Sequence, residues 1–373
     1  MRFSEVIGQQ EVKDVLLAQV RANRLPHALL LSGDTGYGTL ALALALASYV
    51  LCDRQSETDS CGQCPSCLKA DKLIHPDLHF SFPVIKKSSG VTTSDTYLKE
   101  WLTQLESEKY FDLNDWLRVI GTENKQAIIP DDEADSIIRK LSLSSYEGGW
   151  KVMIIWLPEK MHTNAANTLL KTLEEPSNKT LFILCSEHPE QLLDTIVSRT
   201  QRIDVPPLST DSICQALISQ RGLEQDVAAA LARVAGGSWL KALRQLCDTD
   251  DSKVMLQSFV QLMRMAYMRD LAGLMKWSET MAALGREQQK IYLDYMQQML
   301  RENFVYNFNR PELNFMTPQE SDFASKFARF INERNIIRFA EEFAHAQRDV
   351  AANVNGKTIF FNLALQTIIL LRQ

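Results

Sequence analysis

The chain has 373 residues, which is too long for one ordinary hydrophobic core and predicts two or three domains. Hydrophobic residues at 45% and charged residues at 23% are typical of a soluble globular protein, and the formal net charge of -6 excludes attraction to nucleic acid through bulk charge alone. The first residues, "MRFSEVIGQQEV", contain no apolar signal segment, and no apolar stretch approaches the roughly 18 residues of a membrane span, so we expect a cytoplasmic protein without membrane contact.

Short apolar runs alternate with helical patterns from residue 29 onward, and this alternation predicts an α/β core with a mainly parallel sheet. We expect buried strands at residues 29–31, 151–157 and 180–186. The segment "LALALALASYVL" predicts a helix after the first strand. A further helix in "NAANTLLKTLEEP" ends before a proline and has one apolar face, formed by Ala166, Leu169, Leu170 and Leu173.

The stretch "SGDTGYGTL", residues 32–40, follows the first predicted strand and resembles the phosphate-binding pattern G-x-x-x-x-G-K-[ST]. Gly33, Gly36 and Gly38 keep the backbone part of that pattern. Thr39 stands where the lysine is needed, and Leu40 stands where a hydroxyl would hold magnesium. Loss of the lysine charge about 4 Å from a phosphate forfeits roughly 4 kcal/mol at an effective dielectric near 20. The loop is a degenerate nucleotide site, and we expect no bound cofactor in it.

Hydrolysis also needs acidic residues at the end of a neighbouring strand, where they hold magnesium and the attacking water. The strand in "KVMIIWLPEKM" ends in Trp156 and Leu157, which carry no carboxylate. Glu159 and Lys160 are the nearby candidates for a substitute carboxylate and cation, and both lie beyond the expected positions. We therefore expect no ATP hydrolysis by this chain. An active ATPase with a divergent site is the alternative.

Four cysteines, Cys52, Cys61, Cys64 and Cys67, are spaced C-x8-C-x2-C-x2-C in "CDRQSETDSCGQCPSC". Two residues between cysteines let a tight turn direct both sulfurs at one centre, and four thiolates complete the closed shell of a structural zinc site. The spacing therefore predicts a zinc ion that stabilises a loop and performs no chemistry.

Other interpretations of these cysteines stay open. One alternative is that they are four unrelated reduced thiols, and another is that two of them form a redox C-x-x-C pair. His75 and His79 lie nearby in the sequence and are further potential metal ligands. A zinc module that binds nucleic acid is disfavoured because its loop "DRQSETDS" is acidic. A disulfide framework is disfavoured in a chain that we expect to be cytosolic.

Residues of about 85–124 are polar with scattered aromatics and match neither the helical nor the strand period, which predicts a surface insertion or long loop. After "VPPL", residues 205–208, strand signals stop and the pattern becomes helical. A helical unit is expected at residues 210–246, with a break at "AGGSW". Further on, a helix with a buried stripe is expected, formed by Met255, Phe259, Leu262, Met263 and Ala266, and the apolar segment "TIFFNLALQTIILLRQ" is expected to be buried.

The segment "IVSRTQRI" places Arg199 after Ser198, at the end of the helix that follows the third predicted strand. An arginine at such a place is usually solvated or paired with a carboxylate. It can also complete the active site of a neighbouring subunit, where an arginine finger contributes roughly 10³ to 10⁵ in rate.

These segments together resemble the delta-prime subunits of bacterial DNA polymerase III clamp loaders, a family within the AAA+ proteins. The resemblance covers roughly residues 3–245 without the insertion, and several of its motifs are shared with the ATPase subunits of that group. It lies in the four-cysteine module and in "GQQEVKDVLLAQVRANRLPHALLLSG", "HPDLHF", "LSLSSYEGGWKVMII", "NAANTLLKTLEEPSNKTLFIL" and "TIVSRTQRI".

The resemblance implies three domains. Residues 1–205 would form an AAA+ RecA-like α/β domain with a parallel sheet, carrying the zinc module at about residues 50–70 and the insertion at about 85–124. Residues 206–248 would form a small helical lid, and residues 249–373 an all-α collar domain for oligomerisation.

The resemblance also implies a role in DNA replication. The chain would be a non-hydrolysing member of a hetero-pentameric ring with a delta subunit and gamma or tau ATPase subunits, and the ring would load the sliding clamp onto primer-template DNA. In the family's Ser-Arg-Cys motif, matched here by Ser198, Arg199 and Thr200, the arginine is aimed at ATP held by the adjacent subunit. The alternative is an active clamp-loader ATPase of the gamma or tau kind. Those ATPases have a sensor arginine near the position of Leu240, and a leucine cannot make its phosphate contact, which disfavours the ATPase alternative.

Overall fold

The computed structural model of the chain describes residues 1–86, 90–121, 126–177, 179–246, 250–310 and 313–372. The chain divides into two compact units. The first unit comprises Met1–Thr122 and Gln126–Ala242, and the second contains Leu243–Gln373. The finer division of the first unit into a RecA-like domain and a lid stays a prediction.

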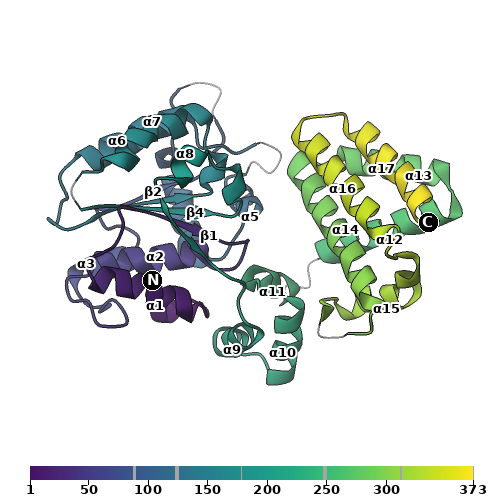
Figure 1. Cartoon of the computed structure of the whole chain (residues 1–373), viewed down its shortest axis with the longest axis horizontal. Helices are drawn as coiled ribbons and strands as arrows, with labels where there is room; N and C mark the ends of the chain where they lie inside the picture. Colours follow the sequence, from purple (N-terminus) through teal and green to yellow (C-terminus); the bar gives the residue numbers. More distant parts are fainter. Residues whose placement is uncertain (87–89, 122–125, 178, 247–249, 311–312, 373) are drawn as a thin grey trace. The chain divides into compact units, whose positions relative to one another are not determined.

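A five-stranded parallel sheet forms the centre of the first unit (Figure 1), which confirms the predicted fold class. The strand order is β2-β3-β4-β1-β5, so that β1 lies between β4 and β5. Three strands were expected from their apolar runs, whereas β2 and β5 have only four residues each and give little periodic signal. The strands are β1 (Ala28–Ser32), β2 (Leu78–Ser81), β3 (Lys151–Trp156), β4 (Thr180–Ser186) and β5 (Gln201–Asp204).

Helices cover both faces of this sheet (Figure 1). Its central strands β1, β3 and β4 are buried along their whole length, which explains why their sequences are apolar without alternation. One face carries α1 (Gln10–Arg21), α2 (Thr39–Val50) and α3 (Pro65–Asp71), and the other carries α6 (Asp131–Ser142), α7 (Thr163–Glu174) and α8 (Asp194–Val197). Short 3-10 turns are η1 (Phe3–Glu5), η3 (Pro158–Lys160) and η4 (Pro189–Gln191).

The insertion is helical and packed against the sheet, so the prediction of a surface loop there was wrong. It contains η2 (Ser94–Tyr97), α4 (Leu98–Ser107) and α5 (Leu113–Val119). Trp101 and Trp116 are fully buried, and the Trp101 ring stacks on Phe82 with a centroid distance of 4.2 Å. The buried residues are only Trp101 and Leu105 in α4 and Trp116 and Leu117 in α5, so each short helix gives few positions from which a helical period can be recognised.

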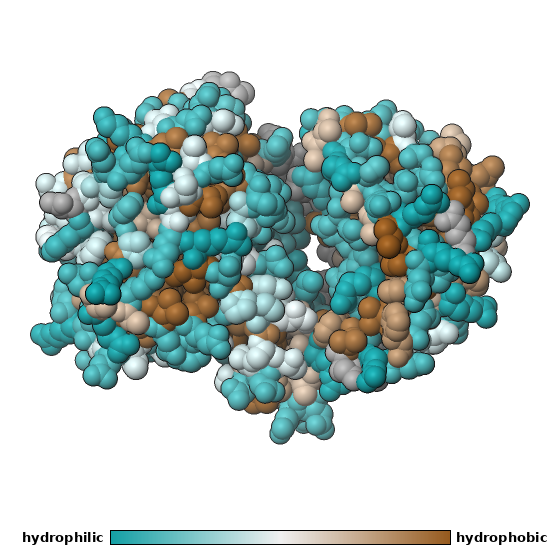
Figure 2. All heavy atoms as spheres, in the orientation of Figure 1, coloured by the Kyte–Doolittle hydropathy of each residue, from teal (hydrophilic) through white to brown (hydrophobic). Residues whose placement is uncertain are grey.

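Three helices follow β5, and the first unit ends at Ala242 within the third of them. They are α9 (Thr210–Arg221), α10 (Gln225–Val234) and α11 (Trp239–Leu246), and the predicted break at residues 235–239 separates the last two. α9 and α10 pack against each other. Hydrophilic side chains cover most of the visible face of this unit, and hydrophobic atoms show only in patches between them (Figure 2).

The second unit consists of helices throughout its described residues. The predicted stripe is confirmed for Phe259, Leu262, Met263 and Ala266, which are buried in a shared core. The predicted burial of the final apolar segment is confirmed along one side of the last helix, where Phe360 and Leu363 join this core. The elements are α12 (Asp250–Met268), α13 (Leu271–Ala283), α14 (Arg286–Tyr306), α15 (Pro318–Phe327), η6 (Ala328–Phe330), α16 (Ile336–Ala351) and α17 (Gly356–Leu370).

No helix among the described residues of either unit is long and apolar enough to cross a membrane.

Candidate functional site

The glycine loop connects β1 to α2 at the carboxyl end of a central strand, where parallel sheets bind ligands. Gly36 and Gly38 adopt left-handed conformations with φ of 85° and 100°, which favour glycine. The backbone N–H of Gly33 donates to the Ser186 carbonyl at 3.1 Å and fastens the loop to β4. The sequence therefore retains the strand-to-helix turn of a phosphate-binding loop.

The two substituted positions of the loop point into the protein. Thr39 and Leu40 begin α2, and both are buried, with Leu40 only 4% exposed. A Cβ placed on Gly33 would lie 3.4 Å from the Thr39 methyl group, so this side chain packs beneath the loop. Apolar packing thus replaces the cation and the magnesium ligand that a phosphate requires.

The start of α11 covers the loop directly. The Ser238 hydroxyl donates to the Thr35 carbonyl at 2.8 Å, and the Trp239 backbone N–H donates to the Gly36 carbonyl at 3.0 Å. A Cβ on Gly36 would lie 2.2 Å from Ser238 Oγ and 3.1 Å from the Cβ of Leu240. Ser238 was not a predicted site residue, because a lone serine after a glycine pair gives no sequence signal for this contact.

Two carboxyl groups lie near this loop in place of the missing cation. Glu159 accepts hydrogen bonds from the Ser186 hydroxyl at 2.9 Å and from the Glu187 backbone N–H at 3.0 Å. Desolvation raises the pKa of Glu187 to about 8, although a hydrogen bond from the Thr35 side chain opposes that shift. Glu159 is therefore engaged within the fold, and Glu187, which is largely protonated at neutral pH, offers no cation to a phosphate in this loop.

Trp156 ends β3 at the place where hydrolysis would need an acidic residue, and it is only 2% exposed. Its ring centroid lies 5.2 Å from that of Trp101 and 5.1 Å from that of Phe111, and both partners come from the insertion. The end of this strand thus supports aromatic packing. A carboxylate here would have no polar partner among these rings.

Arg199 lies just after α8 on the surface of the first unit, with 31% of its side chain exposed. Its Nε donates to Oε1 of Glu174 at 2.7 Å, and its terminal nitrogens donate to Glu174 and, at 2.9 Å, to the Thr195 carbonyl. The Ser198 hydroxyl donates to the same Thr195 carbonyl at 3.2 Å. Glu174 was missed in the sequence because it stands 25 residues before its partner.

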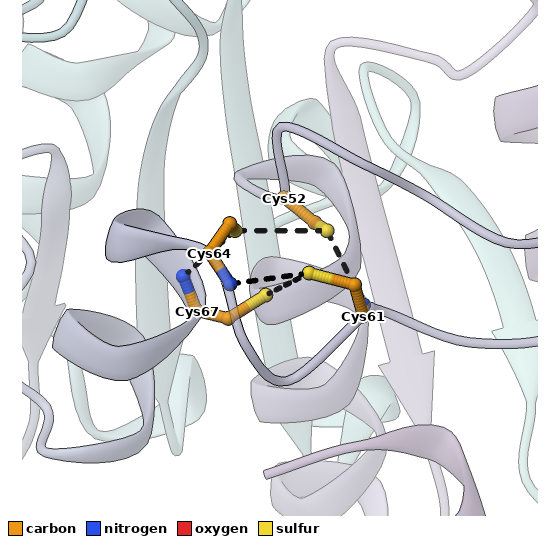
Figure 3. A group of neighbouring side chains, drawn as sticks. All are labelled: Cys52, Cys61, Cys64 and Cys67. Carbon is orange, nitrogen blue, oxygen red and sulfur yellow. Dashed lines mark hydrogen bonds between the residues drawn. The ribbon is translucent and has the colours of Figure 1, made fainter.

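The four predicted cysteines come together at one point (Figure 3). Their sulfur atoms all lie within 4.8 Å of one another, with Cys52 to Cys64 at 4.0 Å and Cys61 to Cys67 at 3.8 Å. Four sulfurs at about 2.3 Å from a tetrahedral zinc ion would be spaced by about 3.8 Å. The geometry fits a four-coordinate metal, and these cysteines can hold a metal such as zinc.

Backbone N–H groups support the sulfur atoms of this cluster. The N–H groups of Cys61, Cys64 and Cys67 each lie 3.3 Å from a cluster sulfur, as expected of donors that stabilise thiolates. Hydrogen bonds from the N–H groups of Gln63 and Cys64 lower the pKa of Cys61 to about 6, whereas burial raises the pKa of Cys52. Burial also raises the pKa of Cys67, so these buried thiols would need a bound cation to become thiolates.

Neither histidine near the cluster belongs to it. Nε2 of His75 lies 3.1 Å from a carboxylate oxygen of Glu147, and burial lowers the pKa of His79 to about 4. The cysteine loop instead holds the start of the chain, because Asp59 accepts the backbone N–H groups of Phe3 and Ser4, each at 2.9 Å.

The sequence family described as "DNA polymerase III, delta subunit" matches residues 8–209. The delta-prime subunit of DNA polymerase III from Bacillus subtilis is 32% identical over 229 residues, which cover 61% of this chain and 54% of the relative. The corresponding subunit from Escherichia coli is 28% identical over 223 residues, covering 60% and 55%. This chain spans about half the length of the curated relatives that it matches.

A solved DNA polymerase III gamma subunit-related protein from Thermotoga maritima aligns with 98% of this chain and with 100% of its own chain. Its identity is 16% and its TM-score 0.40, which is too low to support an argument from shape. The family match over more than half of the chain is sufficient by itself, and this chain belongs to the DNA polymerase III delta-prime subunit family.

Proposed function

We propose that this chain is a non-hydrolysing structural subunit of a bacterial replicative clamp loader and that it supplies Arg199 to ATP held by a neighbouring subunit. Family membership supports the assignment to DNA polymerase III, and relatives also include a tau subunit from Bacillus subtilis, 26% identical over 212 residues. The proposed partners are a delta subunit and gamma or tau ATPase subunits. The ring would act on the sliding clamp and primer-template DNA.

The contrast between the glycine loop and Arg199 is the observation that carries this proposal. The loop has a floor formed by the buried Thr39 and Leu40 and a cover formed by Ser238 and Trp239. Arg199 keeps a partly exposed guanidinium at the surface. A partly exposed arginine can reach a phosphate on another subunit, whereas the covered loop has no cation to offer its own phosphate.

The cysteine cluster is proposed to hold one structural zinc ion. Four sulfur ligands fill the tetrahedral shell, so no position remains for water or substrate and the ion would contribute only stability. Since Asp59 in the same loop binds the N–H groups of Phe3 and Ser4, the ion would also fix the first segment of the chain.

Arg199→Ala in a reconstituted ring tests the arginine role. The variant should assemble as the unchanged chain does, while clamp loading and the ATPase activity that depends on this subunit fall by roughly tenfold or more. Arg199→Lys should recover only part of the loss, because lysine keeps the charge and lacks the planar fork.

Arg202→Ala is the matched control. Arg202 lies three residues further on in β5, and its Nε donates to Asp204 at 2.7 Å. Equal rates for the Arg199 and Arg202 variants would reject the arginine finger. Failure of the unchanged chain to join any ring would instead reject the assignment to a clamp loader.

A further inference from the structure

Tyr110, at the end of the turn after α4, reaches the glycine loop from the insertion. A Cβ placed on Gly38 would lie 3.1 Å from the Cε1 atom of this ring and 3.4 Å from its hydroxyl oxygen. Only 6% of Tyr110 is exposed. The side chain therefore packs on the loop at Gly38, the residue just before α2, near the place where Ser238 covers Gly36.

Three separate segments of the chain meet at this side chain. The backbone N–H of Ile7 donates to the Tyr110 hydroxyl at 3.1 Å. The Trp239 ring packs edge-on against the Tyr110 ring, with a centroid distance of 6.5 Å. One tyrosine thus joins the N-terminal segment, the glycine loop at Gly38 and the first residue of α11.

The residues on either side of Tyr110 hold it in this position. Glu108 accepts the Tyr110 backbone N–H at 3.2 Å and forms an ion pair with Arg221 of α9 at 3.0 Å. On the other side, the Phe111 ring packs on Trp156 with a centroid distance of 5.1 Å. The insertion therefore contacts the loop, the end of β3 and the helices after β5 through one short turn.

We infer that Tyr110 is an internal plug that closes the glycine loop against nucleosides and holds the start of α11 on it. A nucleotide bound in such a loop needs close approach to the glycine backbone. Here side chains of the same chain lie against that backbone, with Ser238 Oγ 2.2 Å from a Cβ placed on Gly36 and Tyr110 Cε1 3.1 Å from a Cβ placed on Gly38. The plug also joins the loop to the helical segment, because the same ring contacts Gly38 and Trp239. Nothing in this arrangement depends on the proposed role of Arg199.

Tyr110→Ala tests the plug with adenosine as the probe. Removal of the ring should lower the midpoint of thermal unfolding by roughly 10 °C and leave a cavity beside Gly38. Adenosine should then raise the midpoint of this variant and leave that of the unchanged chain where it was. Hydrogen exchange should also become faster at the start of α11.

Tyr110→Phe keeps the ring and loses only the hydroxyl, so it should exclude adenosine as the unchanged chain does. Tyr97→Ala is the matched control, since Tyr97 lies in the same insertion and its hydroxyl is 3.5 Å from the Ile85 carbonyl. If Tyr110→Ala is too unstable to titrate with adenosine, p-cresol, which has the shape of the lost side chain, should raise the unfolding midpoint of Tyr110→Ala. It should leave the unfolding midpoint of Tyr97→Ala unchanged. An equal response of the unchanged chain and Tyr110→Ala to both probes would overturn the inference.

Discussion

The carboxylate of Glu174 accepts the Nε–H of Arg199 at 2.7 Å and so connects the end of α7 to the residue after α8. This contact uses two of the N–H groups of the guanidinium, and the Thr195 carbonyl accepts a third. A fourth N–H lies 3.4 Å from the Ser198 hydroxyl, and the fifth is left to reach a phosphate. A carboxylate that holds an arginine at the surface orients it before any partner binds.

Glu174→Ala should therefore weaken the proposed action of Arg199 without unfolding the chain. An exposed ion pair contributes little stability, so the unfolding midpoint should hardly change. In the assembled ring we expect clamp loading to fall by roughly two- to tenfold, less than for Arg199→Ala. The amide oxygen of Glu174→Gln still accepts a hydrogen bond, so the clamp-loading rate of this variant should lie between those of Glu174→Ala and the unchanged chain.

The exposed neighbour Glu175 supplies the control for this series, and Glu175→Ala should load clamps at the rate of the unchanged chain. The Glu174 and Arg199 changes should also be non-additive, because they remove the same interaction. Independent effects in the double variant would rule out a positioning role for Glu174.

The cysteine cluster predicts about one zinc ion per chain. Cys64→Ser and Cys67→Ser should lower the zinc content measured by atomic emission, whereas Cys185→Ser, which changes a buried cysteine outside the cluster, should leave it unchanged. A chelator should speed hydrogen exchange in the loop and around Phe3, whose N–H is bound by Asp59. Full zinc content in the Cys67→Ser variant would contradict the four-sulfur site.

Because the pKa of Glu187 is raised in the fold, we expect its contribution to the free energy of unfolding to fall as the pH rises. Its pKa is raised to about 8 in the fold, and its ordinary value is 4.5, so the folded state binds more protons between these values. The stability that this group contributes is complete below pH 4.5 and is lost as the pH passes 8. Glu187→Gln should therefore be more stable than the unchanged chain at pH 8, by on the order of 2 kcal/mol, and similar to it at pH 4.5. Denaturant unfolding at the two pH values measures this, and an equal gain at both would exclude Glu187 as the titrating group.

The cysteine ligands and the parallel sheet could be predicted from the sequence because their signals are local. A C-x2-C spacing fixes neighbouring sulfurs, and fully buried strands such as β4 are continuous apolar runs. The contacts of the glycine loop could not be predicted in this way. Ser238 reaches Thr35 across 203 residues, and Tyr110 reaches Ile7 across 103, so only the folded chain brings them together.

The secondary structure of the insertion also could not be predicted from the sequence alone. Its polar composition predicts a loop, yet Trp101 and Trp116 anchor two short helices against Phe82. Each helix buries one tryptophan and one leucine, and a periodicity measured over many positions gives so few apolar residues little weight.

Trp156→Asp would restore an acidic residue at the end of β3, and we expect it to destabilise the chain instead of creating a magnesium site. The change removes a buried indole that packs against Trp101 and Phe111 and places a carboxylate among those rings, at a cost of about 3–5 kcal/mol or more. Trp156→Phe keeps an aromatic ring and should cost less. Denaturant unfolding measures both variants, and magnesium should not shift the midpoint of Trp156→Asp, since the loop beside it still lacks a hydroxyl at Leu40. A magnesium-dependent gain in stability would contradict this expectation, because it would mean that a carboxylate at position 156 is sufficient to create a magnesium site.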